Sequence, residues 1–530
     1  MKKLLLVLLL TTCCWAGQPR VDPLVSTSRG LIRGLRAEDG DYDMFLGIPY
    51  AVVDENKPFG AATPHPGFSA PFDAYHDGVQ CLQSAGNTVN GTIQCLQLNV
   101  YVPNKANTAR TLPVIVYIHG GGFGRNHKGL SNLSPKFLIK HDVIMVSLNY
   151  RLGPYGFLCV SEPGYSNQGL KDQLLGIQWV KDNIAAFGGD VNEITLMGQS
   201  AGAMSIDIHM YTSEKLAKRL ILHSGNALNA WLVLPQNDSL AIQVAKEIGF
   251  TGDGIKEALD FLSSSDPADV IKTIEGLNTD RNPISRPCVE PEGDGAVLTD
   301  FPENLKPKVK GMDIIIGHAN KEIMFLYPDS DKEFYSNFKF GQELIGGLDA
   351  AYDEEIVKQF YIGDERPGEH LKDVLLDYGS DFMFVHPTER SINRYLDAGA
   401  NVYRFVFSYE GGRNRNKNRK HLMSPGASHG DDIGYLFGMD MYQNQAITVK
   451  DQEIIDAMTQ MWTDFVKYGD PTPTPPAVLG QRWRAVDAAQ RPYLNIGSPL
   501  ALGSRPFHHR MAFWDLYYKL HGDHVLGYRA

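Results

Sequence analysis

Apolar residues in this chain gather in short runs and in helical periods that alternate along the sequence. Two runs rich in β-branched residues, 113–118 and 143–149, predict buried strands. Segment 167–187 has the period of a helix, with apolar residues at Leu170, Leu174, Ile177 and Val180. The glycine pair that follows at 188–189 is typical of a helix C-terminus.

The same alternation continues toward the C-terminus. Further strands are predicted at 193–197, 219–223, 313–316 and 402–409, and helices at 201–211 and 451–468. Strands separated by helices require crossover connections, which favour a mostly parallel sheet buried on both faces. No repeat or low-complexity linker divides the chain, so we expect one large α/β domain.

Composition narrows the class of protein without naming a chemistry. The chain has 530 residues, of which 43% are apolar and 21% charged, as in ordinary globular proteins. Its formal net charge of −11 argues against a nucleic-acid binder, because such proteins usually carry a basic surface.

The N-terminus has the pattern of a secretory signal. Lys2 and Lys3 precede an apolar run at 4–10, and small residues near Ala16 predict cleavage after that position, with Gly17 as the alternative. The rival interpretation is an uncleaved anchor, but the run is too short to span a bilayer, and no later stretch of about 18 apolar residues exists. We therefore expect a secreted protein without a membrane anchor, with residues 1–16 as signal peptide and 17–530 as one domain.

Four cysteines remain after residue 16, and four cysteines allow three full pairings. Cys81 and Cys95 flank a turn-rich segment and favour a local disulfide. Cys159 and Cys288 lie in apolar contexts, which favour buried free thiols.

Three Asn-x-Ser/Thr sequences predict N-glycosylation, at Asn90, Asn132 and Asn237. Asn132 is the weakest of them, because Pro135 follows its Ser134.

The motif Gly-Gln-Ser-Ala-Gly at 198–202 falls between a predicted strand and a predicted helix. A sharp strand-to-helix turn of this kind, a nucleophile elbow, holds a serine at the edge of the sheet, with glycines where side chains do not fit. Chance matches are common in a chain of this length, but the strand and the helix around the motif favour Ser200 as a catalytic nucleophile.

The motif His-Gly-Gly-Gly-Phe at 119–123 directly follows the predicted strand 113–118. Three glycines let backbone amides approach a substrate oxygen closely, as in the oxyanion loops of lipases and esterases. We expect the N–H groups of Gly121, Gly122 and Ala201 to form an oxyanion hole. A phosphate-binding loop is disfavoured because no Lys-Ser/Thr pair follows the glycines.

A serine nucleophile needs a base, and His429 is the best candidate. It lies among small residues in a turn-rich stretch that could reach the elbow. Its rival His421 follows a basic run and is expected to be solvated, whereas His209 and His223 fall on a predicted helix and strand and are expected in the core.

The base in turn needs a carboxylate to orient it. Glu322 follows the predicted strand 313–316 at its C-terminal end. The chain order Ser, Glu, His is the one found in serine hydrolases that have a nucleophile elbow. Asp313 is at the opposite end of the same strand. The pattern alone leaves Glu322 as a candidate only.

These motifs resemble the carboxylesterase/cholinesterase family of α/β-hydrolases. The further blocks that carry the resemblance are FLGIPYA (45–51), CLQLNVY (95–101), NYRLG (149–153), GLKDQ (169–173), FGGD (187–190), the segment 317–322, HGDD (429–432) and GDP (469–471). The resemblance implies an α/β-hydrolase fold and a triad of Ser200, His429 and Glu322. It also implies Cys81–Cys95 as the first family disulfide and no metal or organic cofactor. We expect the second family disulfide to be absent, because Phe250 follows Gly249 where a cysteine is usual.

Two departures from the family bear on the substrate. Gln199 replaces the acidic residue that cholinesterases carry before the serine, and the loop between Cys81 and Cys95 contains no tryptophan. Without a charge or a ring to hold a quaternary ammonium group, choline esters are poor candidates. Together with the motif at 119–123, these features look most like insect carboxylesterases.

The expected function is hydrolysis of small lipophilic esters, such as xenobiotic, odorant or pheromone esters, through an acyl-enzyme intermediate. One alternative is a juvenile-hormone esterase. Another is an idle cholinesterase-like binding protein, which is disfavoured because all three triad residues are present. We expect a monomer or a weak homodimer.

Overall fold

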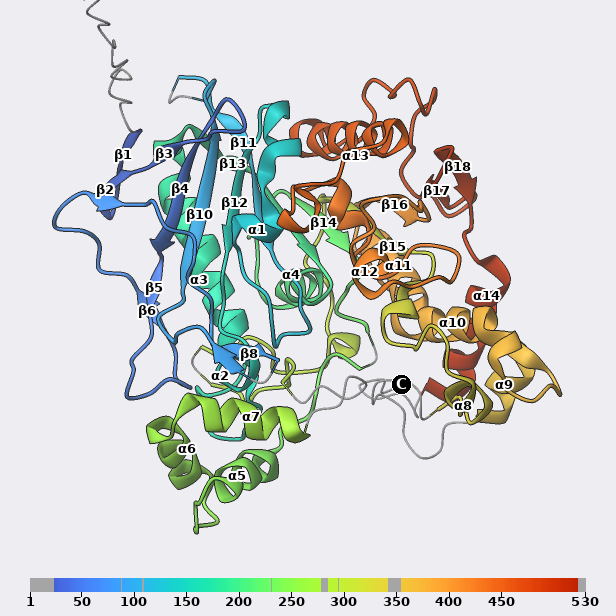
Figure 1. Ribbon diagram of the computed structural model, residues 1–530, viewed down its shortest axis with the longest axis horizontal. Coiled ribbons are helices and arrows are strands. Elements are labelled where there is room, and N and C mark those ends of the chain that lie inside the picture. Colours follow the sequence, from blue (N-terminus) through green and yellow to red (C-terminus); the bar gives the residue numbers. More distant parts are fainter. Residues whose placement is uncertain are drawn as a thin grey trace, which may run out of the picture.

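The computed structural model is built around one eleven-stranded sheet (Figure 1). It describes residues 23–522, except for 87, 107–108, 230, 278–284, 294 and 342–353. In order across the sheet the strands are β18 (Ala501–Ser504), β17 (Pro492–Ile496), β16 (Asn401–Phe407), β15 (Asp313–Ala319), β14 (Arg219–His223), β13 (Gly189–Gln199), β11 (Leu112–Ile118), β12 (Ile144–Leu148), β10 (Gln97–Pro103), β4 (Tyr42–Pro49) and β3 (Leu35–Arg36).

The middle of this sheet is parallel and its two margins are antiparallel. Every neighbouring pair from β12 to β17 runs parallel, whereas β10 pairs antiparallel with β12 and with β4, and β18 pairs antiparallel with β17. Long helical crossovers separate most of the parallel strands in sequence, as parallel pairing requires. The prediction of a large, mixed and mostly parallel sheet flanked by helices is confirmed.

Helices cover both faces of the sheet, and the sequence of β11 shows why. Val114, Val116 and Ile118 belong to one apolar core, whereas Ile115 and Tyr117 belong to the other. Successive side chains of a strand point to opposite faces, so an unbroken apolar run predicts burial on both. The helices of the first core include α3 (Gln168–Asn183), α4 (Ala201–Thr212), α11 (His386–Asp397) and α14 (His508–His521), and the second core contains α13 (Val449–Tyr468).

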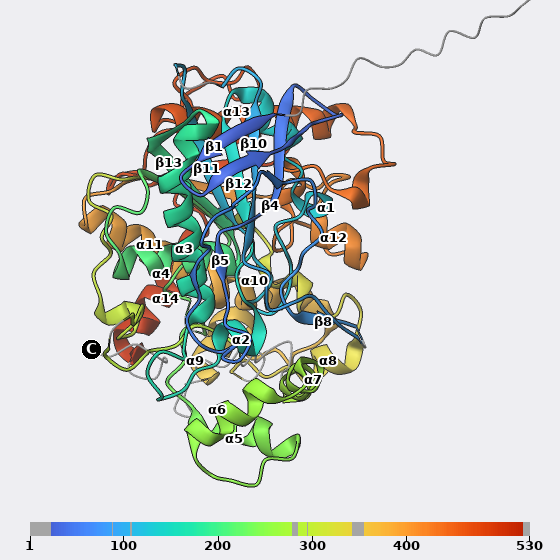
Figure 2. The same cartoon turned by 90° about the vertical axis from the view of Figure 1, so that its left-hand side faces the viewer.

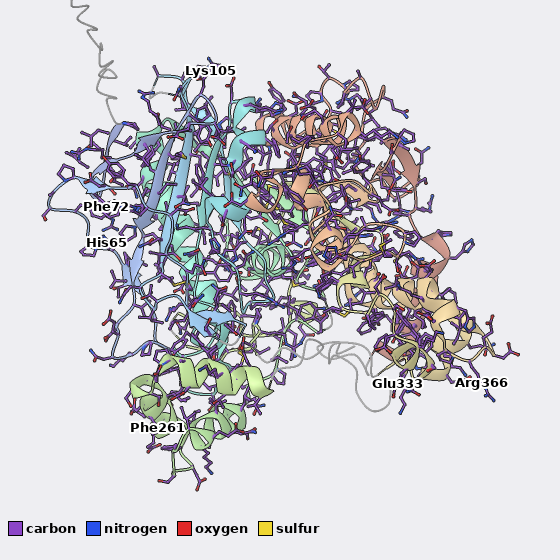
Figure 3. All side chains as sticks on the ribbon, viewed as in Figure 1. His65, Phe72, Lys105, Phe261, Glu333 and Arg366 are labelled. Carbon is purple, nitrogen blue, oxygen red and sulfur yellow. A yellow bond between two sulfur atoms is a disulfide. The ribbon has the colours of Figure 1, made fainter. Side chains whose placement is uncertain are left out.

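The remaining elements lie at the margins of the sheet. The helices α5, α6 and α7 form a group that packs around a small core of its own beside α2 and lies below the sheet in Figures 1 and 2. In Figure 3 its residue Phe261 lies at the opposite end of the molecule from Lys105, which follows β10. These and the other elements are α1 (Leu130–Leu133), α2 (Gly153–Phe157), α5 (Asp238–Glu247), α6 (Ile255–Ser264), α7 (Pro267–Leu277), α8 (Lys332–Ser336), α9 (Glu354–Ile362), α10 (Lys372–Ser380), α12 (Arg415–Lys420), β1 (Leu24–Thr27), β2 (Gly30–Arg33), β5 (Ala51–Val52), β6 (Thr63–Pro64), β7 (Phe72–Asp73), β8 (Gln83–Ala85) and β9 (Thr88–Asn90).

Two disulfides occur among the described residues, and one of them corrects the sequence analysis. Cys81 is bonded to Cys95, with 4.9 Å between their Cα atoms. Cys159 and Cys288, expected as free thiols, are bonded to each other across 129 residues of sequence.

The fold explains why the sequence did not reveal this second bridge. Leu234 pairs with Cys288, and the amide of Asn237 donates to the carbonyl of Cys159, so one short segment holds both cysteines. Their Cα atoms are 6.0 Å apart, within the range that a disulfide spans. Both cysteines lie in apolar surroundings, as predicted, but no local sequence pattern indicates the long-range contact that joins the two thiols.

Removing this second disulfide is expected to destabilise the protein strongly. Replacing Cys159 and Cys288 by Ala together should lower the free energy of unfolding by about 2–4 kcal/mol, because the bridge restricts a long loop in the unfolded chain. Urea denaturation of both proteins measures this, and a titration of free thiols on the denatured wild type should find none from these two positions. A wild type with two titratable thiols there would contradict the assignment.

Two expectations concern the ends of the chain and its relation to membranes. The predicted signal peptide, residues 1–16, lies outside the described residues, as do residues 17–22 and 523–530 of the expected domain. Within the described part, no helix combines the length and apolar character needed to cross a bilayer.

Candidate functional site

Ser200 occupies a strained turn between β13 and α4. Its backbone angles are φ 56° and ψ −129°, which a non-glycine residue rarely adopts and which its surroundings must impose. The Ser200 amide donates to the carbonyl of His223, the last residue of β14. A Cβ atom on Gly202 would lie 2.0 Å from the carbonyl oxygen of Ile118, so only glycine permits this close packing of the turn. The elbow therefore presents Ser200 at the C-terminal edge of the parallel strands.

The glycine loop after β11 packs directly against this elbow. A Cβ on Gly120 would lie 2.4 Å from the carbonyl oxygen of Gln199, and a Cβ on Gly121 would lie 2.1 Å from that of Arg125. Gly121 also has φ +128°, a conformation that favours glycine. The loop is held by Asn126, whose side chain donates to the carbonyl of Gly120.

The backbone amides of this region are available to a ligand. Within the described residues, the N–H groups of Gly121, Gly122 and Ala201 donate to no protein acceptor. Ala201 is the first residue of α4, where unpaired amides and the helix dipole favour negative charge. The three predicted donors thus come from two segments that pack against each other.

His429 and Glu322 form a buried pair. The Nδ1 atom of His429 lies 2.6 Å from Oε2 of Glu322, and their side chains are 8% and 0% exposed. Glu322 begins the short 3₁₀ helix η5 (Glu322–Phe325) just past the C-terminal end of β15, at the same sheet edge as the elbow. The structure therefore brings the side chains of His429 and Glu322 into direct contact.

Two further donors fix the Glu322 carboxylate from its other side. Ser224 Oγ donates to Glu322 Oε1 at 2.5 Å, and the amide of Ala319 donates to the same oxygen at 2.6 Å. Sequence reasoning missed Ser224. The available signal was its position directly after the strand 219–223, at the strand end where the site was expected.

The loop that carries His429 is held by buried polar contacts. The Asp431 carboxylate accepts from the amides of Ser428 and Asn416, and burial raises the pKa of Asp431 to about 6. The Asn416 side chain donates to the carbonyl of His429 at 2.5 Å. The rings of Phe325 and Phe384 pack against the imidazole, with centroids 4.8 and 4.9 Å away. The imidazole is therefore fixed on several sides.

The remaining ring nitrogen of His429 faces Gln199 and not Ser200. Gln199 Nε2 lies 3.1 Å from His429 Nε2. A carboxamide nitrogen donates and does not accept, so the imidazole nitrogen must be the acceptor and the ring proton must sit on Nδ1, facing Glu322. Within the described residues, Ser200 Oγ makes no hydrogen bond to His429. Long nucleophile–base contacts are common in sites without substrate.

The rival candidates lie elsewhere. His421 is exposed, and Asp313 lies at the opposite end of β15 near Arg219. His209 and His223 are buried and already bonded, the first to Gln173 and the second to Asp432 and Trp462. None of them contacts His429 or Glu322.

The structure also locates the predicted glycosylation sites, which stay predictions. Asn90 and Asn237 are exposed, whereas Asn132 is partly buried with its Nδ2 atom 3.3 Å from His127 Nε2. Among the residues described, no three His, Cys, Asp or Glu side chains are placed to hold a metal ion.

Comparison with known proteins assigns this architecture to a family. The family model described as "Carboxylesterase family" matches residues 21–514. Bile salt-activated lipase of Homo sapiens is 30% identical over 98% of this chain and 72% of its own length. The proteins of the same name from Rattus norvegicus and Mus musculus are 29% and 28% identical, over 97% and 96% of this chain and 89% and 90% of their own lengths.

Proposed function

The chain belongs to the carboxylesterase family of carboxylic ester hydrolases, and we propose that it hydrolyses small lipophilic esters with Ser200 as nucleophile, His429 as general base and Glu322 as its orienting carboxylate. One observation supports this proposal above all others. The buried His429–Glu322 pair lies beside the strained turn that presents Ser200, and His429 carries its proton on the nitrogen that faces the carboxylate. In that tautomer Nε2 is unprotonated and is therefore the nitrogen that can take a proton.

The proposed reaction has two steps. His429 Nε2 takes the Ser200 hydroxyl proton as Oγ attacks the ester carbonyl, and the amides of Gly121, Gly122 and Ala201 bind the oxyanion that forms. The alcohol leaves with the proton from His429, and Ser200 retains the acyl group. Water then attacks the acyl carbonyl as His429 takes its proton, and His429 returns that proton to Ser200 Oγ as the bond to the acyl group breaks and the acid leaves. Glu322 accepts the hydrogen bond from Nδ1 and stabilises the imidazolium.

A hollow beside the oxyanion loop supports apolar chains as the substrate class. It is a small hollow with a volume of about 40 Å³. It runs from Gly122 toward α7, and its apolar lining includes Leu82, Pro154, Ile271 and Ile274. A chain attached to a carbonyl held at Gly122 can therefore extend over an apolar wall.

We also propose that the protein is secreted and that it is related to insect carboxylesterases. Two disulfides and the signal-like N-terminus support passage through the secretory pathway, where thiols are oxidised. Gln199 and the short Cys81–Cys95 loop support the likeness to insect carboxylesterases, including their xenobiotic, odorant and pheromone substrates. A juvenile-hormone esterase stays the alternative within the same chemistry.

The substrate class is tested with a series of p-nitrophenyl esters from acetate to decanoate, with juvenile hormone added to the panel. We expect kcat/KM to rise with chain length in the wild type. Ile274→Trp should remove that rise while leaving the acetate, whose chain does not reach α7, within about threefold. Equal profiles for both proteins would exclude the hollow as the chain site, and a wild type that prefers juvenile hormone alone would favour the hormone esterase.

The oxyanion assignment predicts different effects for two neighbouring glycines. Gly121→Ala should lower kcat by about 10²–10³-fold, the typical effect of losing one oxyanion donor, because its Cβ would collide with the Arg125 carbonyl and displace the loop. Gly122→Ala is the matched comparison: its Cβ would meet nothing within 4 Å and its N–H stays in place, although its φ of +61° strains any residue but glycine, so a smaller loss of kcat is expected. Ester kinetics and thermal melting of both variants test this. Equal losses in kcat would contradict the assignment.

A further inference from the structure

Gln199 is the only described side chain that bonds the reacting nitrogen of His429. It is the last residue of β13 and is 5% exposed. Its Nε2 donates to His429 Nε2, whereas its Oε1 accepts no hydrogen bond from any described residue. The carboxamide therefore occupies the lone pair that the hydroxyl of the neighbouring Ser200 must reach.

Other contacts already hold the His429 ring, so Gln199 is not needed to keep it in place. Glu322 binds Nδ1 at 2.6 Å, Phe325 and Phe384 pack on the ring, and Asn416 binds the backbone carbonyl of His429. Removing the Gln199 amide would leave these contacts intact. It would free only the Nε2 lone pair.

We propose that Gln199 is a positioning residue that competes with Ser200 for Nε2 of His429 and so holds the free enzyme in a resting arrangement. This inference rests on the proposed function. Only an unprotonated Nε2 has a lone pair that can accept the hydrogen bond from Gln199. Substrate that enters beside Gly120 meets the unpaired Oε1 atom, and turning the carboxamide toward substrate releases Nε2 to Ser200.

Several charged groups lie on the elements packed around His429, and only one of them bonds its ring. The titratable and charged residues on the elements packed around it are Glu322 (η5), Asp381 (η7, Asp381–Val385), Asp431 and Asp432 (its own loop), and Arg415, Lys417, Arg419 and Lys420 (α12). Of these, Glu322 alone bonds the ring. Asp381 is bonded to Arg510 and Tyr361, and Asp431 to backbone amides.

The test replaces Gln199 by Met, which fills similar volume without a donor, and by Glu, which places a carboxylate at the same nitrogen. The readout is the rate constant for phosphorylation of Ser200 by a small organophosphate between pH 5 and 9, since it reports activation of the nucleophile independently of substrate fit. Gln199→Met should raise the plateau rate constant about 3–10-fold and move the midpoint of the acid limb up by about half to one pH unit, the effect of one hydrogen bond. Gln199→Glu should move that midpoint further upward, because a carboxylate favours the protonated ring.

A matched control separates this effect from loss of packing. Gln173 is also a buried glutamine bonded to a histidine, with its Oε1 2.9 Å from His209 Nε2. Gln173→Met should lower the melting temperature but leave both the plateau and the midpoint at wild-type values. If Gln199→Met leaves plateau and midpoint unchanged, or lowers the plateau, the inference is overturned. A wild type that neither reacts with the organophosphate nor hydrolyses esters would instead overturn the proposed function.

Discussion

Replacing Ser200 by Ala is expected to reduce ester hydrolysis by about 10⁴-fold or more while the protein stays folded. The substitution removes the only atom that can form the acyl intermediate, and the backbone of the turn does not depend on it. The Ser200 amide and carbonyl, which bond His223 and Met204, are retained in alanine. The rate constants for p-nitrophenyl acetate and the melting temperatures of both proteins measure this directly.

A covalent label makes the same expectation independent of any one substrate. An organophosphate should add one phosphoryl group per wild-type molecule, on the peptide that contains Ser200, and none to Ser200→Ala. Ser224→Ala is the informative companion, since Ser224 is a second serine close to the pair and contacts Glu322 Oε1. It should still be labelled, although more slowly. Equal hydrolysis by wild type and Ser200→Ala, or a label on Ser224, would contradict the assigned nucleophile.

The sequence predicted the central layer of this fold well, because its signals are local. The strand run at 219–223 and the helix at 201–211 reappear as β14 and α4, with ends that agree within one residue. Buried parallel strands are recognised in the sequence as unbroken apolar runs, and glycines indicate the turns that follow them. The elbow and the oxyanion loop could be located for the same reason, as their backbone geometry demands glycine at fixed positions.

The contacts that close the site could not be predicted in this way. Glu322 remained a candidate until the family resemblance was considered, because its distance from His429 depends on how β15 and the loop at 428–431 are placed. Ser224 and the Gln199–His429 contact are likewise products of tertiary packing between segments more than 90 residues apart. The prediction of free thiols at Cys159 and Cys288 was wrong for the same reason. Hydrophobic periodicity identifies a segment as a helix or a strand, whereas the packing of the assembled sheet determines which segment ends lie close together.

Glu322→Gln should lower kcat almost as far as loss of the nucleophile, by about 10⁴-fold, even though it changes a single oxygen to nitrogen. The hydrogen bonds of Glu322 explain why. The Ala319 amide can only donate, so the carbonyl oxygen of the new side chain must take the Oε1 position. Its NH₂ group then takes the Oε2 position, which faces Nδ1 of His429 at 2.6 Å.

Two donors cannot share that contact, so Nδ1 must give up its proton and Nε2 must carry it instead. A protonated Nε2 cannot accept the Ser200 proton, and the loss should appear in kcat at every pH from 6 to 9, with KM and the melting temperature little changed. Glu322→Asp keeps a carboxylate and the original tautomer at a longer reach, so it should retain more activity than Glu322→Gln despite the larger change in shape. The reverse order, or a Glu322→Gln variant within tenfold of wild type, would show that Glu322 does not set the tautomer of His429.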